Sequence, residues 1–355
     1  MEFCKNLAQI SLHLKLKSLS SSSAFSHSDL STEALSFASD YSFPSAASDM
    51  KFLRSENTKS NLLGVSFRLP SFTIYELGKE DSPEVLRSFT SSIKQRGIFF
   101  ESIDFDPNFD QLSGKAGKIL IACSDGCSRL FTCDFELSEN QKFITYQVGP
   151  FRLIGSRYIS YTNHFLSVSQ ESSYAITDLD SEKTIFSTKA FDSEASAFEV
   201  SPDGSLLMMG NIYGLSALYD LRSCQLISQS KIKQSEIQSV TTFSMNINGI
   251  YCTGYSNGRI SFSDIRKEGE IVSLPAHIGG VIKSDMNFGD GSVMISGGRQ
   301  GEVRIWDWFN CKVEKEYKVG EKPNLMDFNI EKKMFASGHM EKRLELYSCL
   351  KIDET

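Results

Sequence analysis

The chain has 355 residues, 40% of them hydrophobic, and a net charge of -7 at pH 7, a composition that favours a folded protein over a disordered one. Its lysines and arginines are scattered rather than clustered, so we expect no direct binding of nucleic acid and no anionic membrane as main partner. The sequence has no apolar run of about 18 residues, so we also expect no membrane insertion.

The N-terminal region divides into an alternating segment and a serine-rich one. Within residues 1–17, the stretch 8–17 alternates isoleucine and leucine with polar residues, which is typical of a β-strand. Residues 18–49 show little periodicity, and 13 of the 31 residues from 18 to 48 are serine. This composition predicts a flexible linker that is open to phosphorylation.

The first residues, MEFCKNLAQISLHLKLKSL, contain no long apolar core and no clear cleavage site, so a secretory signal is not expected. The eight cysteines are therefore expected to stay reduced. The expected compartment is the cytoplasm, the nucleus or both.

Residues 50–355 contain seven copies of one pattern, a short apolar strand that ends as in VRIWD around Trp306. Successive copies are 41 to 46 residues apart except for one interval of 56, whose excess falls in the polar insertion PNFDQLSGKAGK. The seven anchor positions are Tyr75, Phe131, Thr177, Tyr219, Ser263, Trp306 and Tyr347.

Three columns of small residues keep the same distance from these anchors. Glycine stands five residues before four anchors and nine residues before four anchors, and serine or threonine stands ten residues before four. The first glycine column predicts a tight turn with positive φ before the anchor strand, and the other two columns predict close packing. Their members are Gly126, Gly214, Gly258 and Gly301; Gly210, Gly254, Gly297 and Gly338; and Ser167, Thr253, Ser296 and Ser337.

These residues resemble the WD40-repeat family, with a literal Trp-Asp at Trp306-Asp307 and a close variant at Tyr219-Asp220. The resemblance implies an all-β chain folded as a seven-bladed WD40-like β-propeller, with one four-stranded sheet in each blade. It also implies an internal hydrogen-bond network, of which His277, Ser296 and Trp306 remain in the sixth blade. The expected blades are 50–90, 96–149, 151–191, 195–232, 233–274, 275–319 and 321–355.

The last blade ends soon after its third strand, so it needs an outer strand from elsewhere. We expect an N-terminal strand to close this blade and assign residues 8–17 to that position, with residues 18–49 as the linker to a propeller over 50–355. The alternative is that residues 1–49 form a flexible tail throughout.

The sequence carries no catalytic or cofactor motif that we recognise. GGRQGE (297–302) lies between two β patterns, so its glycines predict a turn rather than a phosphate loop. SIDFDPNFD (102–110) alternates oxygen ligands but lacks the glycine and the bidentate carboxylate of a calcium loop, and Cys123, Cys127 and Cys133 lack the paired spacing of a zinc site. We therefore expect no enzyme activity, no cofactor, no metal and no small-molecule ligand.

The leading hypothesis is a non-catalytic scaffold subunit of a multiprotein complex, whose partners are other proteins. One alternative is a substrate receptor of a cullin-type ubiquitin ligase that docks through the Asp-x-Arg sequences ending at Arg222 and Arg266. The other is a propeller hydrolase with its site at the central channel, which convergent carboxylates or a histidine beside a nucleophile would indicate. An exposed apolar patch would instead indicate the scaffold.

The resemblance also suggests a partner surface, the narrow face of the propeller. This face is built from the turns between second and third strands and from the connections between blades. The residues expected there, all in second-to-third-strand turns, are Arg299, Tyr255, Tyr213 and His339.

Overall fold

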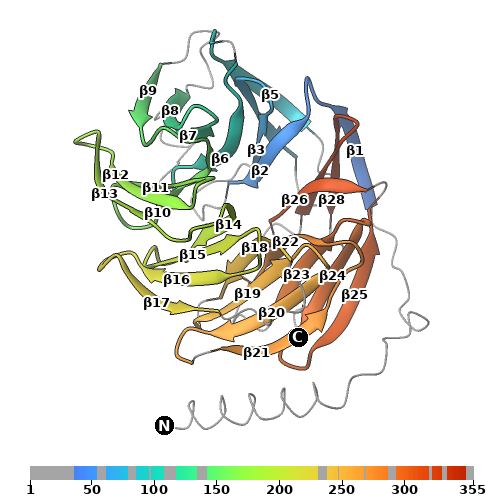
Figure 1. Cartoon of the computed structure of the whole chain (residues 1–355). Helices are drawn as coiled ribbons and strands as arrows, with labels where there is room; N and C mark the ends of the chain where they lie inside the picture. The colour runs from blue at the N-terminus through green and yellow to red at the C-terminus, as the bar shows by residue number, and fades with distance from the viewer. Residues whose placement is uncertain are drawn as a thin grey trace.

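The computed structural model describes residues 36–53, 61–78, 85–95, 97–107, 117–133, 142–230, 238–246, 248–267, 269–286, 293–319, 322–329 and 334–348. Every regular element in these ranges is a β-strand, and the strands form seven sheets of four strands each. Figure 1 shows the sheets arranged around a common axis, which confirms the all-β, seven-bladed propeller. In the part of the chain that the structure describes, no helix has the length and apolarity needed to cross a membrane.

Each of the first six blades takes its four strands consecutively from the chain. Blade 1 holds β2 (Ala47–Phe52), β3 (Asn61–Phe67), β4 (Ser71–Leu77) and β5 (Val85–Ser92). Blade 2 holds β6 (Phe100–Phe105), β7 (Gly117–Cys123), β8 (Cys127–Cys133) and β9 (Phe143–Gln147). Blade 3 holds β10 (Leu153–Ile159), β11 (His164–Ser169), β12 (Ser173–Asp178) and β13 (Lys183–Lys189).

The remaining blades continue the same order until the last one. Blade 4 holds β14 (Ala195–Val200), β15 (Leu206–Asn211), β16 (Ser216–Asp220) and β17 (Gln225–Gln229). Blade 5 holds β18 (Val240–Met245), β19 (Ile250–Tyr255), β20 (Arg259–Asp264) and β21 (Glu270–Pro275). Blade 6 holds β22 (Val281–Asp285), β23 (Val293–Gly298), β24 (Glu302–Asp307) and β25 (Lys312–Lys318). Blade 7 holds β26 (Pro323–Asn329), β27 (Met334–His339), β28 (Arg343–Ser348) and β1 (Ser36–Ser42).

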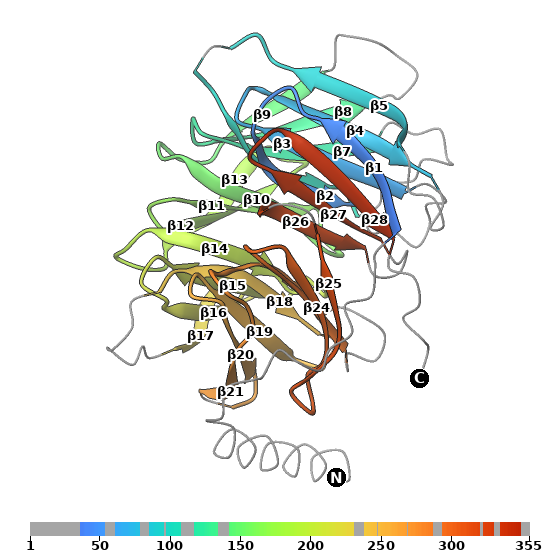
Figure 2. The same cartoon turned by 90° about the vertical axis from the view of Figure 1, so that its right-hand side faces the viewer.

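An N-terminal strand closes blade 7, but it is not the segment that the sequence suggested. β1 pairs antiparallel with β28, from Ser36 opposite Ser348 to Ser42 opposite Arg343, and Figure 2 shows the two strands side by side as Figure 1 does. Residues 8–17 lie outside the described residues. The linker expected over 18–49 is wrong for its last part, because that part contains β1 and the start of β2.

The hydrophobic core consists of seven clusters of buried side chains, and each cluster lies between two neighbouring blades. A single blade therefore buries its faces only when both neighbours are present, and the ring is complete because the first strand of blade 7, β26, contacts the first strand of blade 1, β2. The anchors take part in this packing. Trp306 packs against blade 5, for example, and Tyr219 packs against blade 3.

The two glycine columns have the conformation and the close packing that their spacing predicted. The four glycines five residues before an anchor all have positive φ, between 79° and 88°. The four glycines nine residues before an anchor approach a neighbouring blade closely: a Cβ on Gly210 would lie 2.5 Å from Val240 Cβ. Each anchor lies on the third strand of its blade, as the repeat predicted.

Candidate functional site

The residues expected on the narrow face differ in how far they are exposed. Arg299 and Tyr213 are exposed in the turns that precede β24 and β16, and Tyr213 is 47% exposed. Tyr255 is half-buried, and its hydroxyl lies 3.3 Å from Ser261 Oγ in the same blade. Arg299 and Tyr213 are therefore the two that remain available for contact with a partner.

His339 is not on the surface, which corrects its place among the exposed turn residues. It ends β27 and is only 4% exposed. Its Nε2 lies 3.0 Å from Ser337 Oγ and 3.0 Å from a carboxylate oxygen of Glu345, which is also buried. The side chain is therefore part of the polar interior of blade 7.

The two Asp-x-Arg sequences begin turns after third strands. In the second, Arg266 donates from Nε and Nη2 to the two carboxylate oxygens of Asp264, at 2.8 and 2.9 Å. In the first, Asp220 accepts the backbone N–H groups of Arg222 and Ser223, and the Arg222 side chain is exposed. Asp264 and Arg266 thus form the local turn ion pair that is common at such sites.

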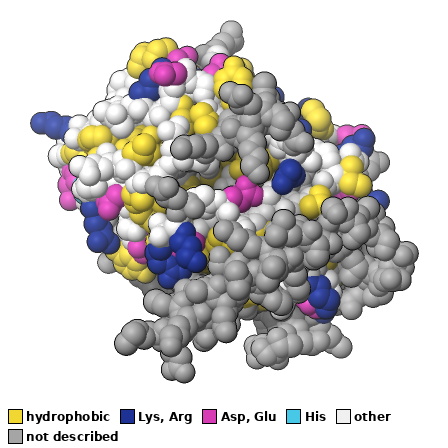
Figure 3. Space-filling view, turned by 60° about the horizontal axis from the view of Figure 1, so that its bottom comes forward, with side chains coloured by type: hydrophobic (Ala, Val, Ile, Leu, Met, Phe, Trp, Pro, Cys, Tyr) yellow, Lys and Arg dark blue, Asp and Glu magenta, His cyan; other side chains and the backbone are white. Residues whose placement is uncertain are grey.

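The narrow face also carries hydrophobic side chains that the sequence analysis did not single out. Of the fourteen exposed large hydrophobic residues in the described ranges, seven lie in its turns and blade connections, six lie on outer strands, and Tyr161 lies in a described turn of the opposite, wide face. The seven are Leu69, Phe99, Phe151, Ile212, Tyr213, Ile278 and Met340. On the face drawn in Figure 3, hydrophobic side chains lie dispersed among charged ones.

Three of these residues, Leu69, Phe99 and Phe151, lie in connected loops of blades 1 to 3 and are called the narrow-face arc. Phe100 N–H donates to Leu69 O at 3.3 Å, and Ser124 N–H donates to Phe99 O at 2.9 Å. These bonds join the β3–β4 turn to the β5–β6 connection, and that connection to the β7–β8 turn. The β7–β8 turn also approaches the β9–β10 connection, because a Cβ on Gly126 would lie 3.0 Å from the carbonyl oxygen of Phe151. The hydrogen bonds hold these loops in place, so the exposed rings project from a fixed surface.

A second group of residues lines the central axis. In all seven blades the register of the first strand shifts by one residue near its start, so equivalent positions can be assigned without ambiguity. The residues two positions after this shift face the axis, because six of the seven line one cavity and the seventh, Asp327, pairs with Lys283 of the same lining. These seven residues, the axial ring, are Lys51, Asp104, Arg157, Glu199, Ser244, Asp285 and Asp327.

Several members of the axial ring bind the backbone of the next blade. Asp104 accepts Tyr158 N–H at 2.9 Å, and Asp327 accepts Phe52 N–H at 2.7 Å. Ser244 accepts Met286 N–H at 2.8 Å. A first strand has no neighbouring strand on its axial side, so these N–H groups would otherwise lack an acceptor. The ring therefore links neighbouring blades.

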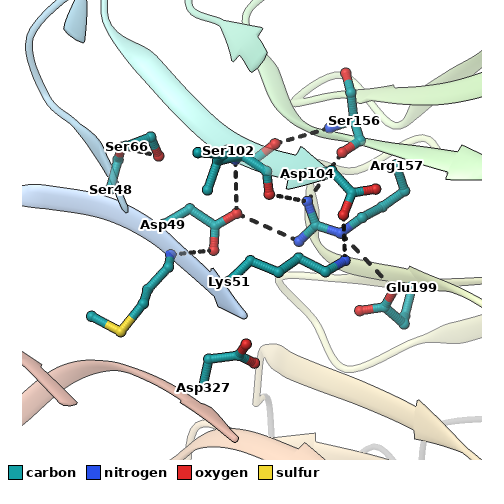
Figure 4. Close-up of polar contacts among 12 residues, drawn as sticks. Ser48, Asp49, Lys51, Ser66, Ser102, Asp104, Ser156, Arg157, Glu199 and Asp327 are labelled. Atoms are coloured by element: carbon teal, nitrogen blue, oxygen red, sulfur yellow. Dashed lines mark hydrogen bonds and ion pairs between the residues drawn. The ribbon is translucent and has the colours of Figure 1, made fainter. Parts of the chain in front are cut away.

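Ion pairs connect residues of the axial ring with one another and with Asp49 and Lys283, which lie two positions earlier on the first strands (Figure 4). Lys51 Nζ lies 2.7 Å from Asp104 Oδ1, and Arg157 Nη2 lies 3.5 Å from Asp49 Oδ2. Lys283 Nζ lies 3.5 Å from Asp327 Oδ1, and Arg157 Nε lies 3.9 Å from Glu199 Oε1. Carboxylates therefore converge at the channel, which is one of the features expected of a propeller hydrolase. Each carboxylate in these four pairs, however, lies beside a cation. No histidine is among the described residues that line the axial cavity.

Burial and these charges shift the pKa values of the axial groups. Burial raises the pKa of Asp49, against the effect of Arg157. Burial would also raise the pKa of Glu199, but the positive charges of Lys51, Arg157 and Lys283 outweigh it and lower that pKa to about 2. Glu199 is therefore an anion throughout the physiological pH range.

The network that the family resemblance implied is present in blade 6. Trp306 Nε1–H donates to Ser296 Oγ at 2.8 Å, and Ser296 Oγ lies 2.7 Å from His277 Nε2. All three side chains are buried. Burial, with the nearby charge of Arg304, lowers the pKa of His277 to about 3, so this histidine is neutral and its role here is structural.

The repeat pattern in the sequence does not reveal the axial ring, because the pattern is anchored on the third strand and the ring lies on the first. The loops between first and second strands vary in length, so the ring position lies between 19 and 27 residues before the anchor. The available signal was a polar residue inside each short apolar first strand, as in SAFEV and LMDFN. This signal is readable only after the first strands have been located independently.

Comparisons with known proteins agree with the fold. No protein-family model matches the chain. A segment of 116 residues is 27% identical to the GATOR2 complex protein WDR24 of Danio rerio, a match that covers 32% of this chain and only 15% of that protein. The crystal structure of Chaetomium thermophilum Raptor superimposes with a TM-score of 0.73 at 15% identity, over 90% of this chain and 30% of that one.

Proposed function

We propose that this WD40-repeat β-propeller is a non-catalytic scaffold subunit of a multiprotein complex, and that it docks other proteins on its narrow face. The observation that carries the proposal is the set of seven exposed large hydrophobic residues in the described turns and blade connections of the narrow face. Exposed aromatic and aliphatic side chains on a rigid surface are typical of contact sites for partners.

Two further points support this role. The similarity to WDR24, which is by its name a protein of the GATOR2 complex, favours membership of a complex. Asp104 and Asp327 each pair with a cation and accept a backbone N–H group of the next blade, so we assign them a role in holding the blades together. A scaffold of this kind would operate in the cytoplasm, the nucleus or both.

The test is affinity purification of the tagged full-length protein, followed by mass spectrometry. One variant replaces Phe99 and Phe151 by serine on the narrow face. A matched control replaces Ile185 and Leu226 by serine on the outer strands β13 and β17, where the side chains are 56% and 50% exposed against 46% and 48% for the first pair. Because all four side chains are exposed, we expect each change to alter stability by only about 0.5 kcal/mol.

We expect the narrow-face variant to lose partners that the control retains. Removal of two anchors from the centre of an interface costs about 2 kcal/mol or more, which lowers affinity more than tenfold. Partner recovery that is unchanged in the narrow-face variant, or lost only in the control, would argue against docking on this face.

A further inference from the structure

A cavity of about 230 Å³ lies at the wide-face end of the central axis. Its inner wall is formed by residues of the axial ring and their neighbours on the first strands. Its mouth is formed by the turns that follow the first strands, including Pro107, Ser160 and Pro202. The cavity therefore opens away from the narrow face, and the proposed scaffold function does not use it.

Charges of both signs line this cavity in equal number. The cations are Lys51, Arg157 and Lys283, and the carboxylates are Asp104, Glu199 and Asp285. They come from five blades, with Lys283 and Asp285 both on β22, so the sign changes around the axis instead of dividing the cavity into two halves. Figure 4 shows four of these groups, Lys51, Asp104, Arg157 and Glu199, pointing toward one another.

The hydrogen bonds inside the protein satisfy Asp104 but not all hydrogen-bonding groups of Glu199 and Arg157. Asp104 is well satisfied, because it accepts Tyr158 N–H and pairs with Lys51. Glu199 accepts one hydrogen bond, from Val200 N–H at 3.3 Å, and its 3.9 Å distance to Arg157 Nε is beyond hydrogen-bond reach. Arg157 Nε is buried without a hydrogen-bond partner among the described residues. Arg157 and Glu199 both line the cavity, and the Glu199 side chain is 23% exposed.

We propose that this cavity binds a small zwitterion, a molecule with one ammonium group and one carboxylate or similar anionic group. Glu199 binds the ammonium group, and Arg157 with Lys283 binds the anionic group. A ligand with a single charge fits the lining less well, because it approaches groups of its own sign in the same small volume. The volume is below that of pockets for drug-sized ligands, so the ligand has few heavy atoms.

A polar cavity of this size also holds water, so the experiment has to separate a ligand from solvent. The probes are the ω-amino acids from glycine to 6-aminohexanoate, each compared with the alkylamine and the carboxylic acid of the same chain length. Binding to the full-length protein is measured by isothermal titration and by the melting temperature. We expect at least one zwitterion to raise the melting temperature with increasing concentration, while its two singly charged analogues do not.

Variants then assign the site. Glu199→Gln keeps the size of the side chain but loses the charge, and we expect binding to weaken about tenfold. Lys283→Gln should weaken it similarly from the anionic end. Glu171→Gln, at an exposed carboxylate in the turn before β12 on the narrow face, is the matched control and should bind like the unaltered chain.

Three results would overturn the proposal. The first is that no member of the zwitterion series binds, which leaves water as the occupant. The second is that an amine or an acid alone binds as well as the zwitterion. The third is that Glu199→Gln and Lys283→Gln both bind like the unaltered chain. The comparison of probes needs no variant, so it decides the question even where a substitution impairs folding.

Discussion

At the scale of single residues, the repeat is maintained by positions that admit one kind of side chain. The glycines before the third strands have positive φ, and several also touch the backbone of the next blade connection. Gly258 combines both conditions, because its φ is 86° and a Cβ would overlap the carbonyl oxygen of His277. Gly97 has a φ of 80° with no atom within 4 Å of its Cβ position, so it meets only the first condition.

We therefore predict that Gly258→Ala destabilises the protein more than Gly97→Ala does. Strain from positive φ costs about 1 kcal/mol at either position, and the overlap at Gly258 adds about 1–3 kcal/mol because the backbone of the blade connection must move. Urea unfolding of the two variants measures the difference. Equal losses of stability would show that the close approach at Gly258 is unimportant.

The neutral state of His277 predicts a pH dependence of stability. Its pKa is lowered from 6.5 to about 3 in the folded protein, first by burial and then by the charge of Arg304. Below pH 6.5 His277 is therefore protonated in the unfolded chain but stays neutral in the folded chain. The free energy of unfolding falls as the pH falls from 6.5 towards 3. Between pH 6.5 and about 4.5 this one group removes up to about 1.4 kcal/mol per pH unit.

The measurement is the free energy of unfolding at several pH values for the unaltered chain and for His277→Gln. The variant should be less stable at pH 7, because it disturbs the contact with Ser296, but its stability should fall less steeply between pH 6.5 and 4.5. The window of Glu199, whose pKa falls from 4.5 to about 2, begins only below this range. Parallel curves would exclude a depressed pKa for His277.

At the scale of elements, β1 has the largest consequence. It covers β28, and Tyr41 within it accepts the N–H of Val85 through its hydroxyl at 2.9 Å, so it also touches the outer strand of blade 1. Its sequence, SFASDYS, lacks the apolar alternation of residues 8–17. An outer strand does not require apolar alternation, because most of its side chains are exposed, as in β13 and β17.

We predict that removal of residues 1–42 destabilises the propeller far more than removal of residues 1–35. The longer truncation deletes β1 and leaves the edge of β28 uncovered, while the shorter one leaves the closing strand in place. The expected difference is several kcal/mol, or about 5 °C or more in melting temperature for a domain of this size. Thermal unfolding measures it, and equal melting temperatures would contradict the closing role of β1.

At the scale of the whole molecule, the two ends of the axis have different chemistry. The narrow face carries exposed hydrophobic side chains, which supports docking of proteins there. The wide-face end holds a small cavity with balanced charges, although the sequence predicted no small-molecule ligand. The docking variants and the zwitterion titration test these two ends separately, so one proposal can fail while the other stands.

The sequence by itself determined the number of blades, the positions of the third strands and the turns with positive φ, because each depends on local spacing and on residues that only a tight turn or a close approach requires. It also indicated that an N-terminal strand closes the ring. Only the tertiary structure decided which segment that strand is, since exposed outer strands carry little pattern. The axial ring and the narrow-face arc likewise depend on residues from different blades, whose separation along the chain varies with loop length, so only the closed ring brings them together.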